Sequence, residues 1–422
     1  MDRNDMEITL QGIQMDEQES ERLVPDSQEI PLPPKICIYR ISTTIPKTNQ
    51  VAYIPQVISI GPIHFGNPKL EMMEMQKHIY MDAFCKRVSK KTKKNLQASD
   101  LFRIIINHEE HIRNCYADYY PPSDEFLYMV LFDAVFIIEF VLRGLNPRYI
   151  NDFIIVQPVL RKMVLLDLFL LENQLPYFVL DILYAELKEK EKFFKLVCDC
   201  FLIDNQNQVF NSLEDDKMLH FVGLMRYILC GAPQNWTWDS YRIKLKYSAS
   251  KLHQAGVVFK VAEGCKSLLD INFESGVLKM PILEVDENFE TVLKNVMALE
   301  QCHYQCESYI CNYIFLMDHL INTAEDVDLL TEAGVIIHWL GSNKMMANLI
   351  NNLCKGVEIY GSNYNNICRQ LNEHYEDPYN HRKATLKLVY FSNLWRGTAT
   401  VIATLLLIMT LIQTICSIKS LY

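Results

Sequence analysis

The stretch from Gly397 to Ile418 contains 22 residues and not one charged side chain, and it is bounded by Arg396 and Lys419. At the α-helical rise of ~1.5 Å per residue, such a helix is ~33 Å long, enough to cross a hydrocarbon core of ~30 Å. We therefore predict a transmembrane helix over 397–418, which has the lipid bilayer as its partner, and a short tail at 419–422. The alternative is a C-terminal helix buried in the core of a soluble protein.

The other end of the chain is strongly acidic. Residues 1–34 carry nine acidic side chains against Arg3 and Arg22, and four prolines close the segment. The acidic residues are Asp2, Asp5, Glu7, Asp16, Glu17, Glu19, Glu21, Asp26 and Glu29. High charge with little apolar content predicts a disordered acidic tail over 1–34. The tail has no apolar run of signal-peptide length, so we expect the C-terminal helix to insert after translation, as a tail anchor.

The charges that flank the predicted span indicate its orientation. Four basic residues precede the span and one follows it: Arg382, Lys383, Lys387 and Arg396 before, and Lys419 after. Because basic residues are enriched on the cytoplasmic side of membrane helices, the bias places the body (35–390) in the cytosol and makes 391–396 a juxtamembrane linker. An extracellular body is the alternative.

Composition excludes one class of partner and favours one compartment. The net charge of −10 and the pI near 5.6 argue against nucleic-acid binding, which needs a concentrated basic surface. The 13 cysteines are scattered through a long chain, which favours reduced thiols over a disulfide scaffold. Asn235-Trp236-Thr237 is a single glycosylation acceptor, about what chance supplies. A glycan there would instead support an extracellular body.

Hydrophobic periodicity predicts that the body is mainly α: a large helical globular domain with a small β-hairpin. Helices are expected at Leu70–Val88 (apolar at Met72, Met73, Met75, Ile79, Tyr80 and Phe84), Met129–Arg143, Pro158–Glu186 with a break or kink at Pro176, and Phe289–Leu320. Two shorter helices are expected, one with a capping box at Thr323 and an end at Gly334, the other capped by Ser342 and closed by Gly356. The hairpin is expected from Leu268–Phe273 to Val277–Val285, with Pro281 confining the second strand to an edge or a bulge.

Four carboxylates fall within the most apolar predicted helices: Asp133, Glu139, Asp167 and Glu172. A buried carboxylate costs several kcal/mol unless it is paired, so each is expected to have a backbone or side-chain partner. The competing hypothesis is a hydrolase that uses Asp133 and Glu172 as acid and base.

Several motifs resemble catalytic or metal-binding signatures without completing them. The run His108-Glu109-Glu110-His111 lacks the second histidine at i+4 of a zinc-protease helix. The glycines of Gly61–Gly66 are not followed by the Lys-Ser/Thr of a phosphate loop. Cys302, His303, Cys306 and Cys311 form the densest cluster of ligand-type residues, in which Cys302 and Cys306, spaced i, i+4, could hold half a zinc site. Buried structural thiols are the favoured interpretation of the cysteines, including Cys198 and Cys200. We therefore assign no catalytic, cofactor-binding or metal residue.

The run Lys86–Lys94 concentrates basic residues at the end of a predicted helix. A solvated helix end is the favoured interpretation. The alternative is a contact with acidic lipid headgroups.

A set of phrases along the chain resembles the plant family known as domain of unknown function 247, over roughly residues 36–418. The phrases, in order, are Ala52–Pro55, Ser59–His64, Phe132-Asp133, Phe136–Glu139, Asp167–Pro176 (DLFLLENQLP), Leu268–Ile271, Leu299–Cys302, Asp318–Asp326 and Trp339–Ser342. The resemblance implies a mostly helical soluble body with a C-terminal membrane helix and no established activity. Some grass members are implicated in pollen self-incompatibility, which implies a recognition role. The chain departs from the family at Ser392–Arg396, where an Asn-Pro-Trp-type entry is usual, and at Ala134-Val135, where Gly-Cys is common.

These observations favour a membrane-tethered, non-enzymatic interaction or signalling protein with an unidentified protein partner. The alternatives are a membrane-attached hydrolase that uses the buried carboxylates and a cell-surface recognition ligand.

Overall fold

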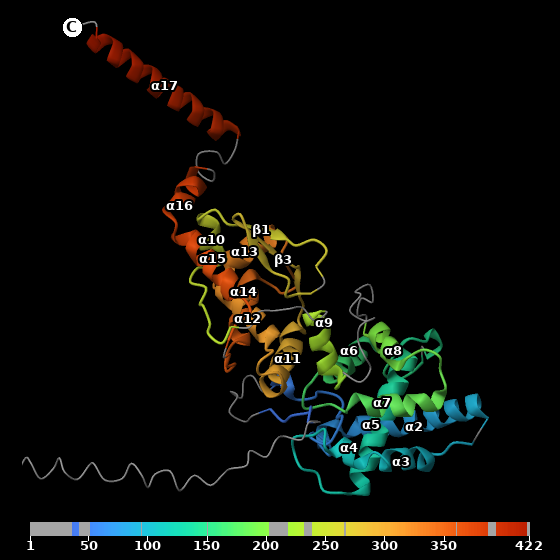
Figure 1. Ribbon diagram of the computed structural model, residues 1–422. Coiled ribbons are helices and arrows are strands. Elements are labelled where there is room, and N and C mark those ends of the chain that lie inside the picture. The colour runs from blue at the N-terminus through green and yellow to red at the C-terminus, as the bar shows by residue number, and fades with distance from the viewer. Residues whose placement is uncertain are drawn as a thin grey trace, which may run out of the picture. The chain divides into compact units, whose positions relative to one another are not determined.

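The computed structural model describes residues 36–41, 51–93, 95–149, 151–201, 218–231, 239–265, 267–359, 361–386 and 394–419. The predicted acidic tail, the Asn235 acceptor, Lys387 and the first half of the predicted linker (391–393) lie outside these residues. The elements below belong to one compact unit, Cys37–Tyr422. The protein is mainly α, with a few short strands and one C-terminal apolar helix, which confirms the predicted fold class (Figure 1).

The N-terminal half of the body is helical and packs around the helix α5. Its elements are η1 (Val51–Tyr53), η2 (Pro68–Leu70), α2 (Glu71–Thr92), α3 (Ala98–Ile106), α4 (Glu109–Arg113), α5 (Asp124–Gly144), η3 (Pro147–Tyr149), α6 (Pro158–Asp167), α7 (Tyr177–Tyr184), η4 (Ala185–Leu187), α8 (Phe193–Cys200) and α9 (Phe221–Cys230). Ser123 caps α5 by accepting a hydrogen bond from the N–H of Phe126. From Phe126 to Val141 nearly every side chain of α5 is buried, as its all-round apolar sequence predicts.

The predicted helix from Pro158 to Glu186 is broken, and the predicted break at Pro176 is confirmed because Pro176 is the N-cap of α7, but the first helix ends earlier than predicted. α6 ends at Asp167 and α7 begins at Tyr177, with turns between them. The turns are fixed by amide side chains: Gln174 Nε2 donates to the carbonyls of Leu168 and Leu170 at 2.6 and 2.8 Å. These bonds satisfy backbone groups that a continuous helix would pair internally, so the apolar run folds as a buried turn.

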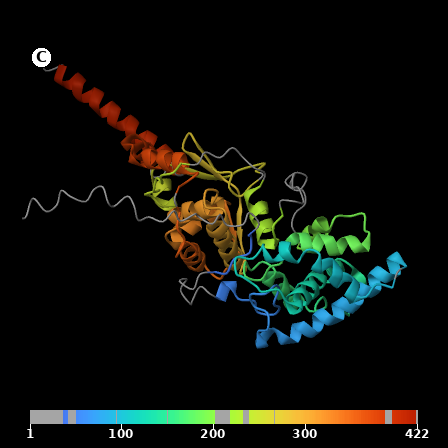
Figure 2. The same cartoon turned by 60° about the horizontal axis from the view of Figure 1, so that its bottom comes forward.

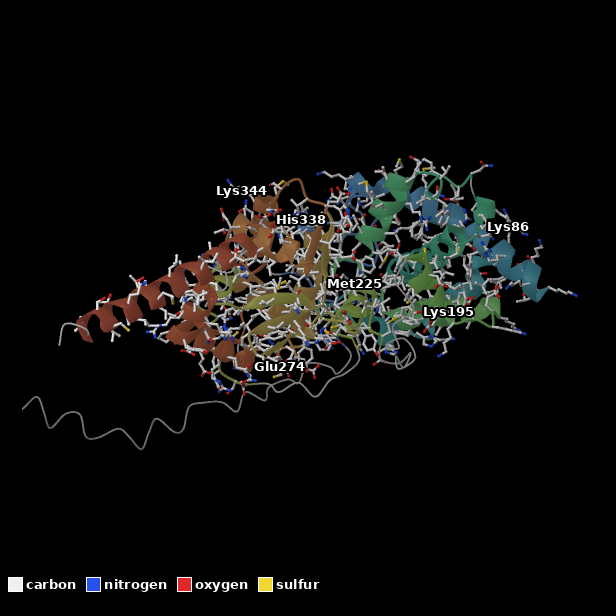
Figure 3. The ribbon with its side chains drawn as sticks, turned by 90° about the horizontal axis from the view of Figure 1, so that it is seen from above. Lys86, Lys195, Met225, Glu274, His338 and Lys344 are labelled. Carbon is white, nitrogen blue, oxygen red and sulfur yellow. The ribbon has the colours of Figure 1, made fainter. Side chains whose placement is uncertain are left out.

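The C-terminal half combines two small sheets with a second group of helices. Its elements are α10 (Ala249–Gln254), β1 (Val258–Val261), β2 (Asn272–Glu274), β3 (Val277–Met280), β4 (Leu283–Val285), α11 (Phe289–His303), α12 (Tyr309–Leu320), α13 (Ala324–Glu332), β5 (Ile336–His338), α14 (Asn343–Leu353), α15 (Asn365–Glu376), α16 (Pro378–Thr385) and α17 (Leu394–Lys419). Met225 of α9 packs against both hydrophobic cores and lies between the two halves in Figure 3.

The predicted hairpin is present as β2 and β3, which pair antiparallel through Phe273 and Leu278. Its turn places Ser275 and Gly276 at φ 51° and 79°, the left-handed pair that a tight hairpin turn needs. The prediction that Pro281 confines the second strand to an edge or bulge is wrong. β3 is the central strand of the order β1-β3-β2, and Pro281 follows its last residue. The chain then enters β4, which pairs in parallel with β5.

The predicted helix from Phe289 to Leu320 is two helices. α11 ends at His303 and α12 begins at Tyr309, and the carboxylate of Glu300 bridges the break by accepting the N–H groups of Ile310 and Cys311. The predicted cap of the next helix is confirmed, because Thr323 and Asp326 form a capping box. Ser342 caps α14, as predicted, although α14 ends at Leu353 and not at Gly356.

Candidate functional site

An irregular, partly buried segment, residues 52–64, is held in place by side chains from other elements, and we call it the attached segment. Asp167, at the end of α6, accepts three successive backbone N–H groups: those of Gln56 at 2.9 Å, Val57 at 2.7 Å and Ile58 at 2.9 Å. Ile58 is fully buried, so its N–H has no access to water, whereas Gln56 is exposed and Val57 is half-buried. Burial raises the pKa of Asp167, and the three backbone donors act against that rise.

Asn173 and Gly61 continue this attachment. Asn173 accepts the N–H of Ile60 at 2.7 Å and donates to the carbonyl of Ile58 at 3.1 Å, as a neighbouring strand would. Gly61 has a φ of 74°, and a Cβ there would lie 2.4 Å from the carbonyl oxygen of Gln174. The phrases around Ser59–His64 and Asp167–Pro176 therefore meet in space and bind each other.

Asp133, from α5, is the buried charge beneath this segment. Its carboxylate accepts the N–H of Gly61 at 2.8 Å and forms an ion pair with Lys77 Nζ at 2.5 Å. Lys77 is itself 1% exposed and also donates to the carbonyl of Ser59 at 2.7 Å. Burial raises the pKa of Asp133 to about 6, although the Lys77 ammonium lowers it.

Glu172 and Glu139 have partners of their own. Glu172 accepts the N–H of Ile41 at 2.6 Å and lies 3.0 Å from His64 Nε2. The Glu139 carboxylate forms ion pairs with Arg87 Nε at 2.7 Å and with Arg143 Nε at 2.9 Å. The prediction that all four buried carboxylates have partners is confirmed. It also leaves Asp133 and Glu172 in separate sets of contacts, which does not favour an acid–base pair.

A groove lies between α2 and the N-terminal part of α5, beside the attached segment. We call it the α2–α5 groove; its volume is about 690 Å³. Phe65, Tyr128, Met129 and Phe132 are among its apolar walls, and Ser59 is part of its lining. The charged side chains among its described lining residues are Glu71, Glu74 and Glu125, with His78 beside them and neither a lysine nor an arginine. The views of Figures 1 and 2 show α2 running alongside α5.

A second hollow of about 650 Å³ lies between α9, the start of α11 and β4. Met225, Leu229, Ile282 and Phe289 give it apolar walls, and Glu284 and Asp286 belong to its lining. The Asp286 carboxylate is occupied, because it accepts the N–H of Phe289 at the start of α11.

The histidine and cysteine motifs of the sequence do not converge on a common ligand. His108 Nδ1 bonds to the carbonyl of Ile104, whereas His111 stacks on Phe178 with ring centroids 4.1 Å apart. Cys302 and Cys306 do not share a helix as predicted, because α11 ends between them. In the described part of the chain, no group of three or more His, Cys, Asp or Glu side chains is placed to hold a metal ion.

The other residues singled out by the sequence contact neighbouring side chains or lie in the core. His303 Nδ1 and Tyr39 Oη are 2.9 Å apart. Cys198, Cys200 and Cys311 are buried, as predicted, whereas the predicted burial of Cys306 is wrong because it lies exposed after the end of α11. In the basic run, Arg87 pairs with Glu139, and Lys91 pairs with Glu189. Figure 3 shows Lys86 at this end of α2, projecting away from the ribbon.

Two cysteines near the break between α11 and α12 are expected to differ in thiol reactivity. Cys306 is exposed in the loop, whereas Cys311 is fully buried and burial raises its pKa well above the ordinary value. We expect iodoacetamide to modify Cys306 in the native protein at least ~100-fold faster than Cys311, because the thiolate is the nucleophile and Cys311 is reached only through local opening. Peptide mass spectrometry over time measures both rates, and Cys306→Ser is the control. Equal rates would show that α11, whose Met297 carbonyl faces the Cys311 thiol, does not shield it from solvent.

Sequence reasoning missed Lys77 and Asn295 as parts of this arrangement. Asn295 Nδ2 donates to the carbonyl of Ala52, and its Oδ1 accepts the N–H of Leu171, so α11 also holds the attached segment. A lysine within the apolar face of α2 was the available signal for Lys77, since a buried ammonium needs an acid.

The elements define a class: a mainly α body, built on a buried segment held by carboxylate and amide side chains, with one apolar C-terminal helix. Residues 38–409 match the DUF247 family model, described as "Plant protein of unknown function". The chain therefore belongs to this plant family, as its sequence phrases predict.

Two relatives from Arabidopsis thaliana support the assignment. The chain is 26% identical over 414 residues to "UPF0481 protein At3g47200", covering 91% of this chain and 86% of the relative. It is 22% identical over 480 residues to "Putative UPF0481 protein At3g02645", covering 90% of this chain and 89% of the relative. No solved structure matches the chain.

Proposed function

We propose that the protein is a membrane-tethered, non-enzymatic interaction or signalling protein with its helical body in the cytosol. The observation that carries the proposal is α17. Its segment Thr398–Ile418 is long and apolar enough to cross a membrane, and its apolar side chains are exposed. A helix buried in a soluble core would instead hide these side chains.

The polar groups of α17 are compatible with lipid. The hydroxyls of Thr404, Thr410 and Thr414 donate to backbone carbonyls four residues earlier, so they do not enter the bilayer unpaired. Arg382 and Lys383 are exposed near the end of α16, before the span, which agrees with a cytosolic body under the positive-inside rule.

The contacts of the buried carboxylates and the lining of the two hollows support the interaction role. The buried carboxylates singled out by the sequence bind backbone N–H groups, lysine, arginine or histidine, which gives them structural roles. The two hollows are apolar with acidic residues in their linings, as expected of surfaces that receive another molecule. No specific observation favours the hydrolase or the cell-surface ligand over this reading.

Charging the centre of α17 tests the tether in the full-length chain. We expect the double substitution Leu406→Arg/Leu407→Arg to move most of the protein from the carbonate-resistant membrane pellet to the soluble fraction. Each arginine at the centre of a span costs roughly 2.5–3.5 kcal/mol of insertion free energy. Fractionation and immunoblotting measure the shift, and Leu406→Val/Leu407→Val is the matched control.

Two outcomes would contradict the proposal. If the wild-type protein is soluble, or if the arginine variant stays in the pellet, α17 does not tether the protein to a membrane. Protection of an N-terminal epitope from protease in intact vesicles would place the body on the other side of the membrane.

A further inference from the structure

The helix α2 exposes apolar side chains on the face that borders the α2–α5 groove. Met72, Met75 and Ile79 are 65%, 73% and 53% exposed. Their i, i+3, i+7 spacing places them on one stripe of the helix. The opposite face is buried in the core through Met73, Tyr80 and Phe84, so the exposed stripe is additional to what the fold needs.

The exposed stripe lies outside the groove lining and adjoins it through Met75. Met75 lies one turn from Glu71 and three residues from His78, and both of these line the groove. The far wall is fixed by aromatic contacts: Tyr128 stacks on Phe102 with centroids 4.0 Å apart, and Phe132 packs 4.4 Å from the His78 ring. A preformed apolar groove beside flexible methionines is well suited to accept an apolar helix face.

The charges around this surface are acidic. Glu71 and Glu125 are exposed at the groove, and Glu74 is only partly neutralised by Lys77, which lies buried beneath it. A segment that carries lysine or arginine beside its apolar face would complement these carboxylates. An anionic membrane surface would be repelled by them.

We propose that the α2–α5 groove binds an amphipathic helical segment of a partner protein. Its apolar face lies against the apolar walls of the groove and the adjoining stripe of Met72, Met75 and Ile79, and its basic residues lie beside Glu71 and Glu125. The inference rests on the proposed interaction function and names the chemistry of the partner. The groove lies between two helices, a geometry in which a third helix can place apolar anchors one turn apart.

The test measures binding of a designed peptide to the full-length protein in phosphatidylcholine nanodiscs. The probe is an 18-residue amphipathic helix of leucine and lysine, and its counterpart has glutamate in place of lysine. We expect the leucine–lysine peptide to bind wild-type protein, and Met75→Ser/Ile79→Ser or Glu71→Lys to weaken binding at least ~10-fold, since anchors at the centre of an interface carry most of its energy. Fluorescence anisotropy of the labelled peptide gives each Kd.

Matched controls separate the groove from attraction to an acidic protein in general. Met345→Ser removes an exposed methionine of α14, and Glu332→Lys reverses an exposed charge of α13. Neither variant should change Kd more than about twofold. All of these positions are on the surface, so circular dichroism should show unaltered folding.

Three results of the peptide measurement would overturn the inference: equal weakening by the control variants, no binding at all, or equal binding of the glutamate peptide. It would also be overturned if the groove substitutions left peptide binding unchanged and instead abolished binding to anionic vesicles or self-association of the protein. None of them bears on the fractionation of the α17 variants. A failed groove therefore leaves the proposed tether standing, and a failed tether leaves the peptide measurement interpretable.

Discussion

Replacing Asp167 with alanine is expected to lower the free energy of unfolding by about 4 kcal/mol. The substitution leaves the N–H groups of Gln56, Val57 and Ile58 without the acceptor that all three share. The buried N–H of Ile58 costs roughly 1–3 kcal/mol when it is left without a partner, and the part-buried donors of Gln56 and Val57 each add a smaller amount. Urea denaturation of the full-length protein in detergent, followed by far-UV circular dichroism, measures the change.

Two further variants calibrate this result. Asp167→Asn keeps one acceptor oxygen but turns an amide NH₂ towards backbone donors, so an intermediate loss is expected. Asp82→Ala removes an exposed carboxylate from α2 and should change stability by no more than about 0.5 kcal/mol. If Asp167→Ala behaves like Asp82→Ala, the three N–H groups have another acceptor and the carboxylate does not hold the segment.

The sequence showed that these carboxylates need partners, but not which partners. Asp167 lies in an apolar run, and the cost of burying its charge requires a donor. The donors come from a segment more than one hundred residues earlier, and neither segment has a helical or strand period that predicts the pairing. Local patterns therefore predicted α5, from its apolar residues, and the caps at Thr323 and Ser342, from their capping side chains. They could not predict which distant segment Asp167 binds.

The two helices that proved to be broken have the same cause. Apolar periodicity continues through residues 168–176 and through the end of α11, so a pattern of side chains alone predicts continuous helices. The breaks depend on Gln174 and Glu300, whose side chains replace internal helix bonds with bonds to other backbone groups. Polar side chains in apolar runs are the signal that could have indicated both breaks.

The α2–α5 groove was missed for a different reason. Met72, Met75 and Ile79 were grouped with Met73 and Tyr80 as apolar positions of one helix, yet the first three are exposed while Met73 and Tyr80 face the core. α2 has apolar residues on both faces, so its sequence does not show which face packs inside. Only the placement of α5 against it settles this.

A second large effect is expected from Lys77→Met, which should lower the free energy of unfolding by about 4 kcal/mol at about pH 8. The substitution keeps the volume of the side chain but leaves the Asp133 carboxylate buried without its cation. Removing one partner of a buried ion pair costs more than removing both, because the remaining charge has no compensation. Lys90→Met, at an exposed position of the same helix, is the control and should have an effect within about 0.5 kcal/mol.

The pH dependence of this variant identifies Asp133 as the cause. In the native protein burial raises the pKa of Asp133 from 3.8 to about 6, against the lowering effect of Lys77. A carboxyl whose folded pKa exceeds its unfolded value stabilises the fold increasingly as the pH falls from about 6 towards 3.8. Without Lys77 the folded pKa rises further, so the loss caused by Lys77→Met should shrink by roughly 2 kcal/mol between about pH 8 and pH 5.

The double variant Lys77→Met/Asp133→Leu completes the argument. With both charges gone, its loss should be smaller than that of Lys77→Met alone at about pH 8, although the N–H of Gly61 then lacks its acceptor. The pH dependence of the single variant should also disappear, because no buried carboxyl remains at this position to bind a proton. A Lys77→Met loss that is equal at both pH values would mean that Asp133 is already protonated at neutral pH. Gly61 and Ser59 would then be held by hydrogen bonds to a neutral Asp133 and to Lys77, without an ion pair between these two side chains.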